Sequence, residues 1–310
     1  MALSRRSFLT GAGGAIAAGS RRMQLTREPA KTRLILLGTA GGPTPKRTRA
    51  APAQVIVAGG AAYVIDCGNG VARQMALAGV PLPSIRHVLI THHHSDHNAD
   101  YGTLLLLAWS SGLRTRVDTW GPAPLGRITS LFLEMSSPDL AIRESDEGLP
   151  PLRPLILPHE IAGPGQLFQE ERVRVRCALV NHPPVRPAFA YRFDAPDRSI
   201  VISGDTSPSR SLIDLARGAD VLVHEALYLP AVDAIAGSGP GAARLKQHLL
   251  NSHTPLQEAG RVAAEAGVKT LVLTHFVPAE TPAVPDSVWL AGARESFRGK
   301  VIVARDLMEV

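Results

Sequence analysis

The segment from His92 to His97 concentrates side chains that bind metals, with four of the chain's eleven histidines and an aspartate in six positions. In an extended segment, side chains alternate between two sides, so His92 and His94 point together while His93 points away. If the chain then turns into a helix, Asp96 and His97 can face a second position nearby. We therefore expect two pairs of ligands, each serving one metal ion.

Neither pair completes a metal site, because zinc takes about four ligands and a catalytic zinc keeps one position for water. Three further candidate ligands follow predicted strands, namely His182, Asp205 and His275. Chemistry is commonly located at the carboxyl ends of strands in α/β folds, so these side chains can converge on one edge. A lone histidine at a strand end is more often structural, but these three groups match what the cluster lacks. Asp205 has two carboxylate oxygens and suits a bridge between two ions.

Short β-branched runs separated by turn residues predict the strands that carry these ligands. Strands are expected at residues 34–37, 54–57, 62–65, 87–91, 173–180, 188–193, 199–203, 221–224 and 270–274, and helices at 71–78, 101–110 and 212–217. A further helix is expected to have Thr254 as its N-cap and Pro255 as its first residue, and to end at Gly267. The proline-rich segment 137–166 predicts a loop excursion. One domain of two sheets flanked by helices is the simplest arrangement.

The first thirty residues have features of an export signal. Arg5 and Arg6 precede a weakly apolar segment at residues 10–19, which resembles a twin-arginine signal and is too short to span a bilayer. We therefore predict a signal and leader at residues 1–30, a folded domain at 31–310, no membrane span, and a periplasmic protein exported by the twin-arginine machinery. The alternative is an ordinary start that happens to contain two arginines, which would leave the protein in the cytoplasm.

The composition favours a layered α/β fold, since 45% of the 310 residues are hydrophobic and only 5% are aromatic. The net charge is +6, but the arginines are scattered, without a dense basic run or interleaved aromatic residues. We therefore do not expect nucleic acid as a partner. We interpret the positive charge as favouring a small anionic substrate.

The cluster itself carries a family resemblance. The pattern His92-x-His94-x-Asp96-His97 resembles the H-x-H-x-D-H motif of the metallo-β-lactamase superfamily. Further stretches are similar to its RNase Z-like branch, which also includes bacterial arylsulfatases: residues 37–43, 66–68, 189–193, 203–205 and 253–254. The resemblance implies an α/β fold in which two mixed β-sheets flanked by helices form an αββα sandwich, with residues 31–310 as the hydrolase domain.

The resemblance also implies a centre of two Zn²⁺ ions, for which Mn²⁺ or Fe²⁺ could substitute. His92, His94 and His182 would hold one ion, Asp96, His97 and His275 the other, and Asp205 would bridge them. A hydroxide between the ions would be the nucleophile, because bound metal lowers the pKa of water to roughly 7. Asp96 would orient that hydroxide or accept its proton, and His253 would protonate the leaving group or stabilise the transition state. His224 and Glu225 are expected to support the site or to pack, not to bind metal.

Such a centre suits several esters, so the substrate must be inferred from other features. We expect a hydrolase of small anionic esters, most like an arylsulfatase and with homodimerisation as an option, because an exported protein would not meet precursor tRNA. The segment 137–166 also differs from the glycine-rich basic arm of RNase Z enzymes. The alternative is a phosphodiesterase or a tRNA 3′-processing endonuclease of RNase Z type, and lactonase or β-lactamase activity is a weaker one.

Overall fold

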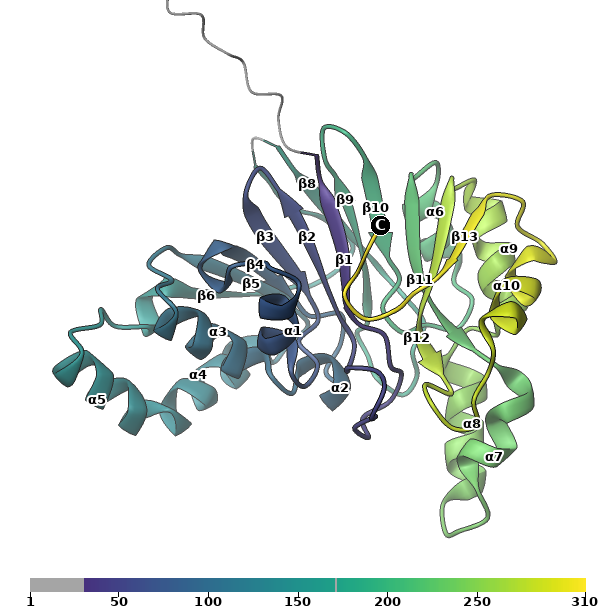
Figure 1. Cartoon of the computed structure of the whole chain (residues 1–310), viewed down its shortest axis with the longest axis horizontal. Coiled ribbons are helices and arrows are strands. Elements are labelled where there is room, and N and C mark those ends of the chain that lie inside the picture. The colour runs from purple at the N-terminus through teal and green to yellow at the C-terminus, as the bar shows by residue number, and fades with distance from the viewer. Residues whose placement is uncertain (1–30, 171) are drawn as a thin grey trace, which may run out of the picture.

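The computed structural model describes residues 31–170 and 172–310 (Figure 1). The predicted export signal and leader at residues 1–30 lie outside the described residues, so periplasmic export stays a prediction. Within the described ranges, no helix has the length and apolar character needed to cross a membrane.

Two seven-stranded sheets form the centre of the fold. In spatial order, the first sheet contains β14 (Met308–Glu309), β1 (Arg33–Gly38), β2 (Ala53–Ala58), β3 (Ala61–Ile65), β4 (Ile85–Leu89), β5 (Val117–Gly121) and β6 (Ile156–Glu160). The second contains β13 (Lys300–Val303), β12 (Thr270–Val277), β11 (Val221–Leu227), β10 (Ser199–Ile202), β9 (Phe189–Asp194), β8 (Arg174–Leu179) and β7 (Gly165–Gln169). Each sheet contains both parallel and antiparallel pairs of strands. In the first sheet, for example, β3 is parallel to β4 and antiparallel to β2.

Helices cover the outer face of each sheet, as Figure 1 shows. The first sheet is flanked by α1 (Val71–Leu77), α2 (Ser95–Asn98), α3 (Tyr101–Ser110), α4 (Leu125–Met135) and α5 (Ser137–Asp146). The second is flanked by α6 (Arg210–Ala216), α7 (Val232–Ala236), α8 (Ala242–Ser252), α9 (Leu256–Ala266) and α10 (Asp286–Arg294). Short 3₁₀ turns occupy Leu82–Ser84, Arg153–Leu155 and Leu229–Ala231.

Alternation along the strands divides the core into two layers. In β1, Leu34 and Leu36 belong to the core between the sheets, whereas Ile35 and Leu37 pack with α1 and α3 on the outer face. A strand whose two faces are both buried needs apolar residues at successive positions. This accounts for the unbroken apolar runs that predicted the strands, and it confirms the αββα sandwich.

Most predicted elements are present, but the segment 137–166 was wrongly predicted as a loop. It contains α5, β6 and the start of β7. Pro138 lies in the first turn of α5, where proline is tolerated, and Arg143 pairs with Asp139 and Glu147 one turn away on either side. The helix cap at Thr254 is also shifted, because Pro255 is the N-cap and the Thr254 hydroxyl donates to the Thr206 carbonyl instead.

The two sheets are joined directly beside the histidine cluster. Backbone hydrogen bonds link the turn after β1 to β12, with Gly41 N–H donating to Phe276 and Phe276 N–H donating to Thr39. A Cβ atom on Gly41 would come within 2.9 Å of the His275 ring and 2.8 Å of the Phe276 carbonyl. Glycine at this position therefore allows the first sheet to approach the strand that carries His275.

Candidate metal centre

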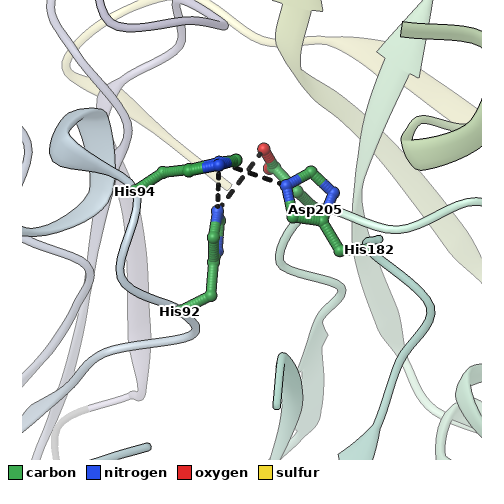
Figure 2. Close-up of side chains that lie close together, drawn as sticks. All are labelled: His92, His94, His182 and Asp205. Carbon is green, nitrogen blue, oxygen red and sulfur yellow. Dashed lines mark hydrogen bonds and ion pairs between the residues drawn. The ribbon is translucent and has the colours of Figure 1, made fainter. Parts of the chain in front are cut away.

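Four predicted ligands converge where β4, β8 and β10 end. Figure 2 shows His92, His94, His182 and Asp205 pointing toward one another, and their ligand atoms all lie within 4.8 Å. His94 Nδ1 is 3.0 Å from His92 Nε2 and 3.2 Å from His182 Nε2. Asp205 Oδ2 lies 4.0 Å from His92 Nε2. Three imidazole nitrogens and a carboxylate oxygen are a donor set typical of zinc.

A second group lies on the other side of Asp205. Asp96, His97 and His275 also place their ligand atoms within 4.8 Å of one another. His97 Nε2 and His275 Nε2 are 3.3 Å apart, and Asp205 Oδ2 lies 3.3 and 3.2 Å from them. The structure thus brings together all seven predicted ligands, with Asp205 between the two groups.

Hydrogen bonds behind the ligands determine which ring nitrogen faces the centre. His182 Nδ1 donates to the Ser252 carbonyl at 2.9 Å, which leaves Nε2 unprotonated toward His94. His97 Nδ1 donates to Asp66 Oδ2 at 2.8 Å, and the Thr91 amide donates to Asp66 Oδ1 at the same distance. Carboxylate and carbonyl partners of this kind orient histidine ligands in metal sites. Asp66 was noted in the sequence only as part of a motif, so its supporting role was missed.

The electrostatic environment favours a cation at this position. Burial by itself lowers the pKa of His97, but Asp205, Asp66 and Asp96 outweigh it and raise that pKa well above the ordinary value. Asp205 Oδ1 and His275 Nδ1 are buried without a hydrogen-bond partner among the described residues. A buried carboxylate oxygen without a partner is costly unless a cation neutralises it. The residues present therefore fit the divalent ions that the fold implies.

His253 lies beside the centre and is paired with Glu225. Its Nδ1 is 2.9 Å from Glu225 Oε2, and Glu225 Oε1 accepts the Thr206 amide hydrogen at 2.7 Å. Burial alone lowers the pKa of His253, but the carboxylates of Glu225, Asp205 and Asp96, with Glu225 the largest contributor, more than compensate and raise it to about 9. His253 also lies within 4.8 Å of Asp205 and His275 through its ligand atoms. The pair provides a protonated imidazole next to the centre.

Two other histidines near the centre have distinct positions. His93 faces away as predicted, since its Nε2 donates to the Pro122 carbonyl at 2.8 Å and its Nδ1 accepts from Asn98. His248 lies on α8 with its ring 5.9 Å from that of His94. Burial and the neighbouring His253 lower the pKa of His248, which favours its neutral form. The α7–α8 hairpin that positions it was not predicted.

A cavity of about 680 Å³ opens onto the centre. Its polar floor includes His94, Asp96, Asp205, His253 and His275, and an apolar wall is formed by Ile235, Leu245, Leu249 and Val277. The turn after β1 closes another side, where Lys46 contributes its side chain and forms no ion pair with a described residue. Figure 1 shows the wall-forming helices α7 and α8 extending beyond the end of the second sheet.

Comparison with known proteins agrees with this geometry. The family described as the beta-lactamase superfamily domain matches residues 62–276, which carry all seven candidate ligands. The chain belongs to the metallo-β-lactamase superfamily. A relative from Mycobacterium bovis BCG named Ribonuclease Z is 35% identical over 283 residues, covering 89% of this chain and 97% of the relative. Another Ribonuclease Z, from a Mycobacterium species, is 34% identical over 277 residues, covering 89% and 94%.

Solved structures show the same fold. Human tRNase Z, short form, superposes with a TM-score of 0.67 at 23% identity, covering 90% of this chain and 98% of that one. The metallo-β-lactamase fold protein YhfI from Bacillus subtilis superposes with a TM-score of 0.65 at 21% identity, again covering 90% and 98%. At these identities the likeness concerns the fold alone.

The relatives overturn two predictions about the substrate. The preference for an arylsulfatase was wrong, and so was the expectation that nucleic acid is not a partner, because the curated relatives are named Ribonuclease Z. The lack of a basic arm in segment 137–166 does not set this chain apart from these relatives, because the alignment covers 89% of this chain and 97% of the relative and leaves little room for a long additional arm. The broader prediction of a metal-dependent hydrolase is supported by the fold and the relatives.

Proposed function

We propose that this chain is a metal-dependent endonuclease that hydrolyses a phosphodiester bond in RNA, with the 3′ end of a tRNA precursor as its substrate class. The observation that carries the proposal is the 35% identity to a Ribonuclease Z over 97% of that relative's length. The arrangement of ligands, protonated histidine and open cavity supports the same chemistry. Residues 31–310 constitute the hydrolase domain in this proposal.

The proposed cofactor is a pair of Zn²⁺ ions, with Mn²⁺ or Fe²⁺ as alternatives because imidazole and carboxylate ligands accept all three. One ion would be held by His92, His94 and His182, the other by Asp96, His97 and His275, and the Asp205 carboxylate, which lies close to both groups, would serve as a further ligand. When bound, such ions stabilise negative charge on the attacking and leaving oxygens and lower the pKa of water.

The two proton transfers of the reaction are assigned to Asp96 and His253. Asp96 is held by the Gly42 amide, which donates to its Oδ2 at 3.1 Å, and its carboxylate is assigned to accept the proton of the attacking water. His253 is assigned to donate a proton to the leaving 3′-oxygen through Nε2, because its Nδ1 is bonded to Glu225. A leaving alkoxide needs this proton, so a general acid contributes typically 10²- to 10⁴-fold.

Lys46 is assigned to a phosphate at the mouth of the cavity. Its ammonium group donates to the Thr44 hydroxyl, and the side chain lines the cavity without an ion pair among the described residues. An unpaired cation at the entrance attracts a polyanion and raises its local concentration. The +6 net charge of the chain acts in the same direction.

Cleavage of a tRNA precursor carrying a 3′ trailer by the zinc-loaded full chain tests the proposal. We expect endonucleolytic cleavage that leaves a 3′-hydroxyl on the tRNA, together with RNA binding that weakens steeply with salt. Bis(4-nitrophenyl) phosphate should also be hydrolysed, and 4-nitrophenyl sulfate should not.

The Asp205→Ala variant is the matched control, since it should lose both metal and cleavage while its fold is checked by circular dichroism. Metal analysis of the wild-type protein shows whether any inactivity is caused by a loss of metal ions. A fully metal-loaded wild-type protein that leaves the tRNA precursor uncut would overturn the proposed function.

A further inference from the structure

The ring of His248 lies at the junction of the candidate ligands and the candidate general acid. Its centroid is 5.9 Å from the His94 ring, 5.8 Å from the His182 ring and 5.7 Å from the His253 ring. The side chain is half-buried and lines the same cavity as His94 and His253. His248 is therefore within reach of a substrate group next to the bond that would be cleaved.

The hydrogen-bond network determines which nitrogen of His248 carries the proton. The Ser252 hydroxyl donates its hydrogen to the Pro183 carbonyl, which can only accept. Ser252 Oγ must then act as the acceptor toward His248 Nδ1, 3.2 Å away, so Nδ1 carries the hydrogen. Nε2 of the neutral ring is left with a lone pair and has no hydrogen-bond partner among the described residues. His248 thus offers the cavity an acceptor.

An acceptor at this position requires a donor on the substrate. The oxygens of a phosphodiester accept hydrogen bonds and offer no donor, whereas the 2′-hydroxyl of ribose can donate and distinguishes RNA from DNA. In a ribonucleotide, the 2′-hydroxyl is attached to the carbon next to the one that bears the leaving 3′-oxygen. Neighbouring oxygens of one sugar would match neighbouring histidines: with the 3′-oxygen at His253, the 2′-hydroxyl would lie toward His248, whose ring is 5.7 Å away.

We propose that His248 Nε2 accepts a hydrogen bond from the 2′-hydroxyl of the nucleotide on the 5′ side of the scissile phosphate, which makes the site selective for ribose there. This assignment rests on the proposed function. It goes further by identifying a specificity-determining residue that the metal ligands and His253 do not include. The site would disfavour DNA, and RNA with a modified ribose, relative to unmodified RNA at that single nucleotide.

The test compares two RNA substrates that differ only in the 2′ substituent of one nucleotide. One has ribose throughout, and the other has 2′-fluoro in place of the 2′-hydroxyl at the nucleotide on the 5′ side of the cleavage site, which keeps the sugar's shape but cannot donate. For the wild-type protein we expect kcat/KM to be about three- to tenfold lower with the fluorinated RNA, the usual range for one neutral hydrogen bond. In His248→Phe, the ratio of kcat/KM for the all-ribose RNA to kcat/KM for the fluorinated RNA should fall to about one.

Two further variants complete the experiment. Gln247→Ala, on the exposed side of α8 where the side chain hydrogen-bonds to Asn251, should keep the wild-type ratio of kcat/KM for the two RNAs. His248→Gln has an amide oxygen that can accept the same bond and should keep part of the preference. As a readout that needs no turnover, the 5′ cleavage product ending in ribose should bind wild-type protein more tightly than its 2′-fluoro counterpart, and His248→Phe should remove that difference.

The outcomes separate the two proposals. A wild-type protein that cuts both RNAs equally well, or a His248→Phe variant that retains the wild-type ratio, overturns the role of His248 and leaves the endonuclease intact. A wild-type protein that does not cut the all-ribose RNA overturns the endonuclease and the assignment of His248 together.

Discussion

Glu225→Gln removes the charge that keeps His253 protonated, while an amide oxygen remains to accept the Thr206 hydrogen. The rise in the His253 pKa from 6.5 to about 9 corresponds to about 3 kcal/mol in favour of the protonated ring. Because the pKa is raised, the protonated form persists until the pH rises through about 9. In the variant, burial is opposed only by the Asp205 and Asp96 carboxylates, so the pKa of His253 falls.

The consequence for catalysis is a shift of the alkaline limb of the pH profile. At pH 8, the protonated fraction of His253 should therefore drop, and kcat for RNA should fall by roughly tenfold for each unit by which the pKa drops below 8. Bound cations repel the protonated ring in both proteins, so the quantity to measure is the difference between wild type and variant in the pKa of the alkaline limb. This difference is obtained from profiles of kcat against pH, between pH 5.5 and 10, on an RNA substrate.

A second substrate separates proton donation from other effects of Glu225→Gln. Nitrophenolate is a stable anion and needs no proton to leave, so hydrolysis of bis(4-nitrophenyl) phosphate should be affected much less than RNA cleavage. His253→Ala should show the same contrast and keep its metal. Equal losses on both substrates, or an alkaline limb that does not move in Glu225→Gln, would refute the role of the pair.

Three other changes have defined outcomes. Asp205→Ala should lower the metal content of the purified protein, measured by elemental analysis, and full occupancy would contradict its placement between two ions. Asp66→Asn should weaken metal affinity by about 10- to 100-fold in a chelator competition, because the partner that orients His97 is impaired; unchanged affinity would count against that role. Gly260→Ala should lower the free energy of unfolding by about 1–3 kcal/mol, since its Cβ would lie 2.2 Å from a backbone oxygen of α10. Gly239→Ala, which meets no atom within 4 Å, is the matched control, and equal melting temperatures for the two variants would contradict the packing argument.

Residues close together in the sequence were the most informative about the centre. The alternation of His92, His93 and His94 follows from backbone geometry, so the outward orientation of His93 could be predicted and is confirmed by its bond to Pro122. The strands before Asp205 and His275 were predicted from their apolar runs, and the strand before His182 from apolar residues alternating with arginines. By contrast, β6 in the segment 137–166 and β7 at its end depend on pairing with β5 and β8, which a local pattern does not reveal.

The sequence by itself determined the sandwich fold, the candidate ligands and the family. These features depend on local periodicity and on a compact motif, which a single chain displays directly. Only the tertiary structure placed Glu225 against His253 and brought His248 to the cavity beside His94 and His182, because these residues come from different elements. The proton on His253 is set by Glu225, whose proximity arises only after the chain has folded, whereas His248 and Ser252 are neighbours one turn apart on α8.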